Sequence, residues 1–155
     1  MPQTPIDTLQ RLAALHHWEH HRHGHNLLAE IRGAWSRYTL HGCWDSRENV
    51  LHLLCSINAE IPQEKIPSIY RLIGKINETL WLGNFIYSSN TKRVHFRLSL
   101  LANDNDEFVR RLQEMLALLQ RECDRCYPGI QQVAWTNLDV DSAVQMLNEP
   151  EQGHA

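Results

Sequence analysis

The sequence lacks a long apolar run, and no stretch approaches the roughly 18–20 residues that a membrane-spanning helix needs. It also lacks a basic excess, because 15 Lys and Arg residues stand against 18 Asp and Glu residues and give a formal net charge of −3. Proteins that bind nucleic acid without regard to its sequence carry a clear positive excess. We therefore expect neither a membrane nor a nucleic acid as a partner.

Cysteine and glycine are also scarce, with four and seven residues. Four cysteines in a chain of this length do not make a disulfide scaffold. The glycines are scattered and form no phosphate-binding loop, and no G-x-S-x-G motif of a serine hydrolase is present. The first residues, MPQTPIDTLQRLAAL, lack the basic and then apolar layout of a signal peptide. We expect a cytoplasmic protein with reduced thiols, no enzymatic activity and no cofactor.

The sequence does contain enough apolar material for one ordinary domain, since 43% of its 155 residues are hydrophobic. We expect residues 1–147 to form a single domain and residues 148–155 to be a disordered tail. Ten histidines and five tryptophans are the unusual part of the composition. Trp44 and Trp135 are predicted to lie in the core, whereas core and protein interface are equal alternatives for Trp81.

The spacing of apolar residues predicts an α+β fold. Helical spacing predicts four helices: one from Pro5, one between Pro62 and Leu82, one from near Asp104 to Tyr127, where Pro128 and Gly129 interrupt it, and one after Asp139 that ends near Leu147. Alternating or continuous apolar runs predict five strands: Leu27–Arg32, Ser36–Asp45, Val50–Ile57, Phe85–Ser88 and Arg93–Leu101. The order α-β-β-β(β)-α-β-β-α(α) indicates an antiparallel sheet with helices packed on it.

Three segments carry a resemblance to a known family. They are residues 33–85, which include INETLWLGNF, residues 95–100 (HFRLSL) and residues 122–135 (ECDRCYPGIQQVAW). These segments resemble the YbjN family, also described as putative bacterial sensory transduction regulators, and the likeness spans roughly residues 18–147. The resemblance implies the fold of type III secretion chaperones, a small twisted antiparallel sheet flanked by helices and often paired into homodimers. It implies no enzymatic activity, cofactor or catalytic residue.

The resemblance predicts a non-enzymatic regulatory or chaperone-like module that binds a protein or peptide partner and forms a homodimer. Such a module would recognise its partner at an exposed sheet edge or a helix-lined groove. The second predicted helix and its exit supply the candidate contact residues Ile69, Tyr70, Ile73 and Trp81. Tryptophan and tyrosine are frequent at the energetic centres of protein interfaces.

The histidine-rich stretch HHWEHHRHGHN supports an alternative function, a metal-binding or pH-responsive protein. Its candidate ligands are His16, His20, His21, His23 and His25. If the first helix continues through the stretch, His16 and His20 lie one turn apart and form a chelating pair. If the stretch is a strand, His21, His23 and His25 share one face. A polar turn that happens to be rich in histidine is the third interpretation.

Cys123 and Cys126 form a C-x-x-C motif, which is found in redox and zinc sites. Here the pair lies at the C-terminal end of a predicted helix, where the helix dipole opposes a thiolate. Both residues also continue the apolar stripe of that helix. We therefore interpret them as core-packing residues.

Overall fold

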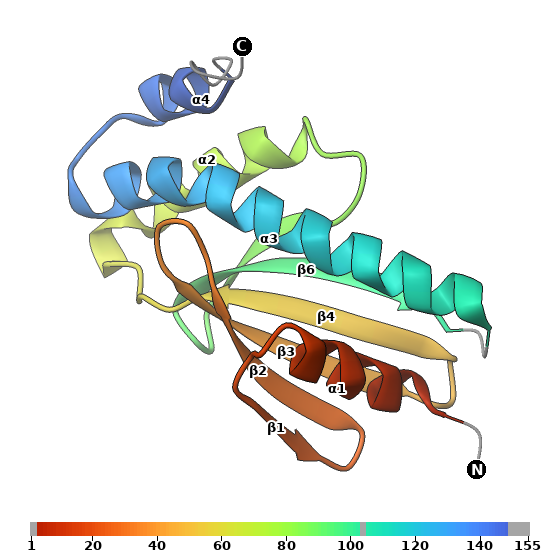
Figure 1. Cartoon of the computed structure of the whole chain (residues 1–155). Helices are drawn as coiled ribbons and strands as arrows, with labels where there is room; N and C mark the ends of the chain where they lie inside the picture. Colours follow the sequence, from red (N-terminus) through yellow and green to blue (C-terminus); the bar gives the residue numbers. More distant parts are fainter. Residues whose placement is uncertain (1–2, 103–104, 149–155) are drawn as a thin grey trace.

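The computed structural model describes residues 3–102 and 105–148, which form a six-stranded sheet and four α-helices (Figure 1). Along the chain the elements are α1 (Pro5–Leu15), β1 (His20–His23), β2 (Asn26–Arg32), β3 (Arg37–Asp45), β4 (Val50–Ile57), the 3-10 turn η1 (Gln63–Lys65), α2 (Ile66–Asn77), β5 (Asn84–Ser88), β6 (Arg93–Leu101), α3 (Asp106–Trp135) and α4 (Val140–Asn148). The strand order is β1-β2-β3-β4-β6-β5, and every neighbouring pair is antiparallel. The predicted α+β class and antiparallel sheet are confirmed.

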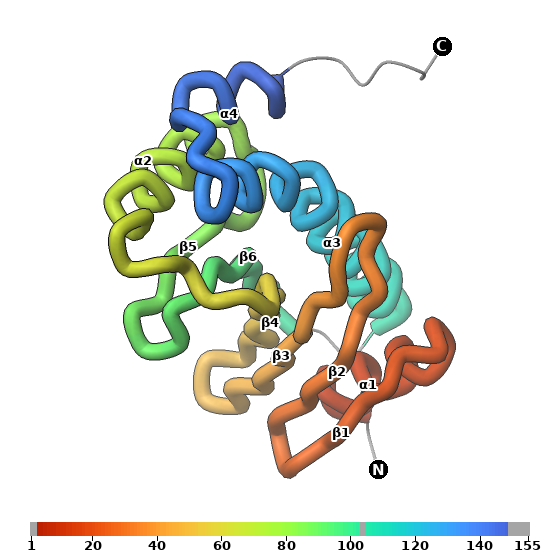
Figure 2. Tube along the Cα trace, turned by 90° about the vertical axis from the view of Figure 1, so that its left-hand side faces the viewer, coloured from red at the N-terminus to blue at the C-terminus, as the bar shows by residue number. Residues whose placement is uncertain are grey.

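One face of the sheet carries the core. Alternate side chains of the central strands are fully or almost fully buried on this face: Leu27, Ala29, Ile31, Tyr38, Leu40, Leu51, Leu53, Cys55, Ile57, Val94, Phe96 and Leu98. Helices α1 and α3 lie on the same side of the sheet, and α2 packs against β5 and α3 (Figure 2). Most side chains between the buried ones, such as His41 and His52, point to the opposite face and stay half-buried or exposed; His95, which bonds Ser56 and Thr91, is buried there. A period of two therefore separates a core face from an open face.

Helix α1 begins where the sequence predicts it. Thr4 and Asp7 form a capping box, in which the Asp7 carboxylate accepts the Thr4 backbone N–H at 2.8 Å, and Pro5 occupies the first turn. Asp7 also pairs with Arg22 of β1, and this hydrogen bond is the main reason that the pKa of Asp7 falls to about 2. The contact ties the edge strand to the helix.

Helix α3 runs through Pro128 and Gly129 to Trp135, so the predicted interruption after Tyr127 is wrong. Proline in a helix interior costs about 3 kcal/mol. The residues beyond it, however, bury Ile130 and Val133 almost completely, and each such side chain contributes roughly 1.5–3 kcal/mol. Packing of the last two turns against the core therefore outweighs the missing hydrogen bond.

Helix α2 is shorter than the predicted segment 62–82, because it starts at Ile66 after η1 and ends at Asn77. The Asn77 side chain then bonds both backbone groups of Phe85. Its Oδ1 accepts the Phe85 N–H at 2.8 Å, and its Nδ2 donates to the Phe85 carbonyl at 2.9 Å. Phe85 lies on β5, an edge strand, so this amide occupies backbone groups that a further strand would need.

The last predicted helix is confirmed as α4, with the Asp139 carboxylate accepting the Ser142 backbone N–H at 3.0 Å at its start. The predicted tail, residues 148–155, lies outside the described residues except for Asn148, which ends α4. Asp104, named as the start of the third helix, also lies outside them. In the described residues no helix combines the length and the apolar character needed to cross a bilayer.

Candidate functional site

A groove opens where α2, the segment before it and the β5–β6 turn meet. Its volume is about 650 Å³. The lining is formed by Glu60, Ile61, Pro62, Gln63, Ile66, Tyr70, Tyr87, Ser89 and Lys92. A backbone hydrogen bond of 2.8 Å from the Ile61 N–H to the Lys92 carbonyl joins the two walls. The groove therefore has walls that are tied together and a lining that mixes apolar and aromatic side chains with polar ones, which suits a recognition site.

Tyr70 and Tyr87 form the aromatic part of this groove. Their ring centroids are 5.3 Å apart at an interplanar angle of 76°, an edge-to-face arrangement that aromatic pairs favour. Tyr70 is nevertheless 52% exposed, so each ring holds the other in place while leaving area for a partner. Tyr87 and Lys92 were not predicted from the sequence, because only the fold brings β5 and the β5–β6 turn to α2.

The four candidate contact residues separate into two groups. Ile69 and Ile73 are 0% and 5% exposed and belong to the core, because they lie on the side of α2 that faces the other elements. Tyr70 and Trp81 are at the surface, and Trp81, in the connection between α2 and β5, is 81% exposed. A contact surface on this helix is therefore limited to Tyr70 and Trp81 of the predicted set.

The other tryptophans are less buried than expected. Trp44 is half-buried and packs against the core cluster, in partial agreement with its predicted core position. Trp135, for which a core position was also predicted, is 38% exposed at the end of α3. Trp35 is 64% exposed at the tip of the β2–β3 hairpin.

The histidine-rich stretch is not a continuation of α1, so the predicted helical chelating pair of His16 and His20 is wrong. The helix ends at Leu15, and His17 adopts a left-handed conformation with φ 58°, which turns the chain. His16 stacks on Trp18 instead, with ring centroids 4.7 Å apart. The spacing of the histidines alone could not distinguish a continued helix from a turn followed by a strand.

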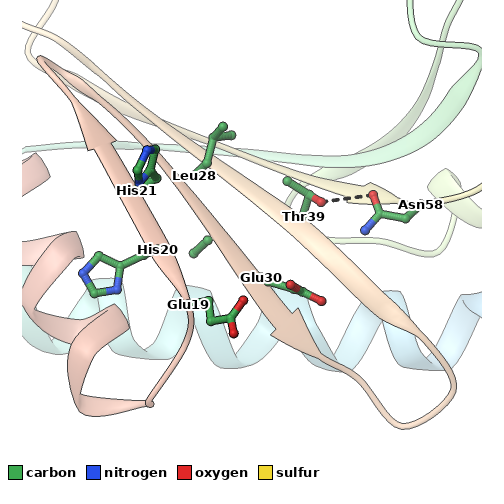
Figure 3. Close-up of a pocket in the computed structure, with 8 residues that line it drawn as sticks. Glu19, His20, His21, Leu28, Glu30, Thr39 and Asn58 are labelled. Carbon is green, nitrogen blue, oxygen red and sulfur yellow. Dashed lines mark hydrogen bonds between the residues drawn. The ribbon is translucent and has the colours of Figure 1, made fainter.

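The second geometry, a strand, is realised only for residues 20–23. His21 and His23 share the open face of β1, whereas His25 follows in the turn after Gly24. His20 and His21 point away from one another, and His21 lies beside Leu28, its partner across the strands (Figure 3). In the described part of the chain, no three His, Cys, Asp or Glu side chains are grouped so that they could hold one metal ion.

A shallow cavity of about 520 Å³ lies next to His20 and His21, and Figure 3 shows the side chains around it. Glu19, which precedes β1, and Glu30 of β2 are joined by a backbone hydrogen bond of 2.9 Å from the Glu30 N–H to the Glu19 carbonyl. Glu30 also forms an exposed ion pair of 3.1 Å with Arg37. Exposed pairs of this kind contribute little, about 0–1 kcal/mol.

The C-x-x-C motif is part of the core, as predicted. Cys123 and Cys126 are both 0% exposed, and Cys55 of β4 lies beside Cys123. The pKa of Cys123 is raised by its hydrogen bond with Cys55 and by burial, and burial raises the pKa of Cys126 to about 12. Cys43 lies on the opposite face of the sheet and is half-buried. The four thiols therefore do not converge on one site.

We expect one fast-reacting thiol per native chain when the protein is treated with Ellman's reagent at pH 8. The thiolate is the reacting species, so buried thiols of raised pKa react slowly, and Cys43 accounts for the fast phase. Denaturant should expose all four thiols, and Cys43→Ser should abolish the fast phase. A fast phase that instead disappears in Cys126→Ser would contradict the core assignment.

Comparisons with known proteins identify the family. The model of the YbjN family, described as "Putative bacterial sensory transduction regulator", matches residues 5–132, which is most of the chain. Comparison with curated proteins and with solved structures yields no significant match. The likeness to type III secretion chaperones therefore stays a prediction. The chain belongs to the YbjN family.

Proposed function

We propose that this YbjN-family protein is a non-enzymatic regulatory or chaperone-like module that binds an extended peptide segment of a protein partner. The observation that carries the proposal is the groove with the edge-to-face pair of Tyr70 and Tyr87. Tyrosine supplies a large and rigid contact area at low entropic cost, and it is frequent where proteins bind one another. The four free thiols suit a reducing compartment, so we also propose that the module acts in the cytoplasm.

The chemistry of the groove suggests the kind of segment it takes. Ile61, Pro62 and Ile66 offer an apolar surface for one bulky side chain next to the tyrosines. Glu60 and Lys92 place charges of both signs at the margin, where they set orientation more than affinity. We therefore expect the bound segment to carry an apolar anchor flanked by charged residues.

The test uses a photo-crosslinking amino acid at Gln63, an exposed residue that lines the groove. In the native host, illumination should give discrete adducts that mass spectrometry assigns to the same peptide in replicate experiments. Tyr70→Ala should remove most of these adducts. Arg71→Ala is the matched control, because Arg71 is the neighbouring residue and forms only an exposed ion pair with Asp141.

A crosslinker at Arg47, in the β3–β4 turn, controls for random encounters. Adducts that are the same at Gln63 and Arg47, or that persist in Tyr70→Ala, would contradict the proposal. Both substitutions are at exposed positions, so equal melting temperatures of the variants will show that the fold is unchanged.

We further propose that two copies of the chain pair through Trp81, the most exposed large apolar side chain of the described residues. An exposed indole of this kind is a typical interface anchor. Light scattering at micromolar concentration should give twice the mass of the chain, and Trp81→Ala should give a monomer. A monomeric wild-type protein would exclude the homodimer.

A further inference from the structure

The tip of the β2–β3 hairpin reaches across to α3 and is fixed there by one carboxylate (Figure 1). Asp124 of α3 accepts the backbone N–H of Ala34 at 2.9 Å and the hydroxyl of Tyr38 at 2.7 Å, both with the same oxygen, Oδ1. Burial and the hydrogen bond with Asp124 raise the pKa of Tyr38 well above its usual value. The buried hydroxyl therefore stays protonated and holds the tip firmly.

Further contacts fix the same tip. The Gly33 N–H donates to the Ser36 carbonyl at 2.8 Å and closes the turn. The side-chain amide of Gln120 on α3 donates to the Arg32 carbonyl at 3.3 Å. A Cβ at Gly33 would collide with the ring of Tyr38 and with Asp124, so glycine is required for this close approach.

This fixed tip presents Trp35 to solvent. The indole is 64% exposed although the backbone that carries it is held in place on both sides. Trp35 adds no large buried area to the fold, and a rigid support for an exposed indole is typical of a preorganised binding residue.

Trp35 and α3 border an open cavity of about 700 Å³. It is lined by Ala34, Trp35, Ala117, Gln120, Arg121, Asp124 and Arg125. The volume is within the range of sites for small organic molecules, about 300–1,000 Å³. The small side chains Ala34 and Ala117 leave a flat apolar area beside the indole.

The charged side chains that line the cavity indicate the charge of a ligand that would bind there. Arg125 is held by Glu122 at 2.8 Å, and one oxygen of Asp124, Oδ1, accepts both hydrogen bonds from the hairpin. Arg121, by contrast, has no carboxylate within ion-pair distance in the part of the chain that the structure describes, and it is exposed at the cavity. A guanidinium in this position favours an anion, above all a carboxylate that accepts two N–H bonds.

We propose that this cavity binds a small organic anion with a flat apolar part, that is, an aromatic carboxylate or a molecule of the same chemistry. The flat part stacks on the Trp35 indole above Ala117, and the carboxylate pairs with Arg121. The site lies on the β2–β3 hairpin and α3, so it is separate from the groove at Tyr70 and does not depend on it.

The probe is 2-naphthoate, added to the 15N-labelled full chain and followed by two-dimensional NMR. The five tryptophans give five indole N–H signals, and Trp35→Phe assigns the signal of Trp35. We expect the Trp35 indole and the Gln120 side-chain amide to shift in a saturable way, with a dissociation constant of roughly 1 mM or below. The neutral 2-naphthamide should bind about tenfold more weakly, because it forms no ion pair with Arg121.

Arg121→Gln and Trp35→Ala should each weaken binding of 2-naphthoate about tenfold. Arg110→Gln, on the exposed side of α3 outside the cavity, and Trp81→Ala should leave it unchanged. Equal shifts of all five indoles, or equal affinity for the neutral probe, would overturn the proposal. Tighter binding of the peptide acetyl-Glu-Trp-Glu-amide than of 2-naphthoate would also overturn it, by assigning the cavity to a protein partner.

Discussion

Gly83→Ala is expected to lower the free energy of unfolding by about 2–5 kcal/mol. Gly83 has φ 75°, a conformation that costs an L-residue about 1–2 kcal/mol. A Cβ there would also collide with the ring of Phe96, which is 0% exposed and packs edge-to-face on Phe85 at 5.0 Å. The ring has no free space, so the overpacking adds about 1–3 kcal/mol. Urea unfolding followed by circular dichroism measures the loss.

Two further variants separate the causes of this loss. Gly24→Ala is the matched control, because Gly24 has φ 61° but no atom within 4 Å of an added Cβ, so only the backbone cost of about 1–2 kcal/mol applies. In a Phe96→Leu background, where the ring is gone, Gly83→Ala should cost no more than Gly24→Ala. An undiminished cost in that background would show that the collision is not its origin.

Asp124→Ala is expected to cost about 3 kcal/mol, although Asp124 is not part of the apolar core. The substitution leaves the buried Tyr38 hydroxyl without its acceptor and frees the Ala34 N–H. A hydrogen bond to a charged group contributes about 1.5–3 kcal/mol, and an unsatisfied buried donor costs about 1–3 kcal/mol. The hairpin tip should also loosen, which amide hydrogen exchange at Ala34 will measure.

Asp124→Asn keeps an oxygen acceptor in place and should cost only about 1 kcal/mol. Tyr38→Phe removes the donor, so in that background Asp124→Ala should lose most of its effect. The double-mutant cycle gives the coupling between the two side chains directly. Strictly additive losses would contradict the inferred contact.

The sequence predicts the strands of this fold well where hydrophobic alternation is regular, and less well where tertiary contacts decide. β6 was predicted correctly, because Val94, Phe96 and Leu98 alternate with polar residues. For β1 the sequence leaves a strand as only one of three alternatives, since no apolar residue in HHRH marks a buried face. That strand exists because β2 offers backbone partners and α1 holds Arg22, and neither contact is visible in a local pattern.

For β4 the sequence does not correctly predict which faces of the strand are covered. Its nearly continuous apolar sequence predicts a strand covered on both faces, yet Leu54 lies half-buried on the open face of the sheet. Composition could not decide whether a helix covers this face. Tertiary packing also explains why α3 continues through Pro128. Proline usually ends a helix, but the last turns of α3 pack into the core.

The candidate sites were predicted only in part. Helical spacing placed Ile69, Tyr70 and Ile73 on one contact surface, but a helix has two sides and the fold buries both isoleucines. Trp35 and Arg121 are 86 positions apart, so no spacing argument connects them. Their proximity depends on the hairpin tip that Asp124 holds against α3.

The amide of Asn77 on the Phe85 backbone has a consequence for assembly. An antiparallel sheet has two edges, and a chain that offers both can add copies at either end and grow into a fibre. Here Asn77 occupies the outward backbone groups of Phe85 on the β5 edge, whereas β1 forms the opposite edge of the sheet. The Asn77 amide therefore disfavours growth of the sheet at its β5 end, because a strand added there would have to displace it.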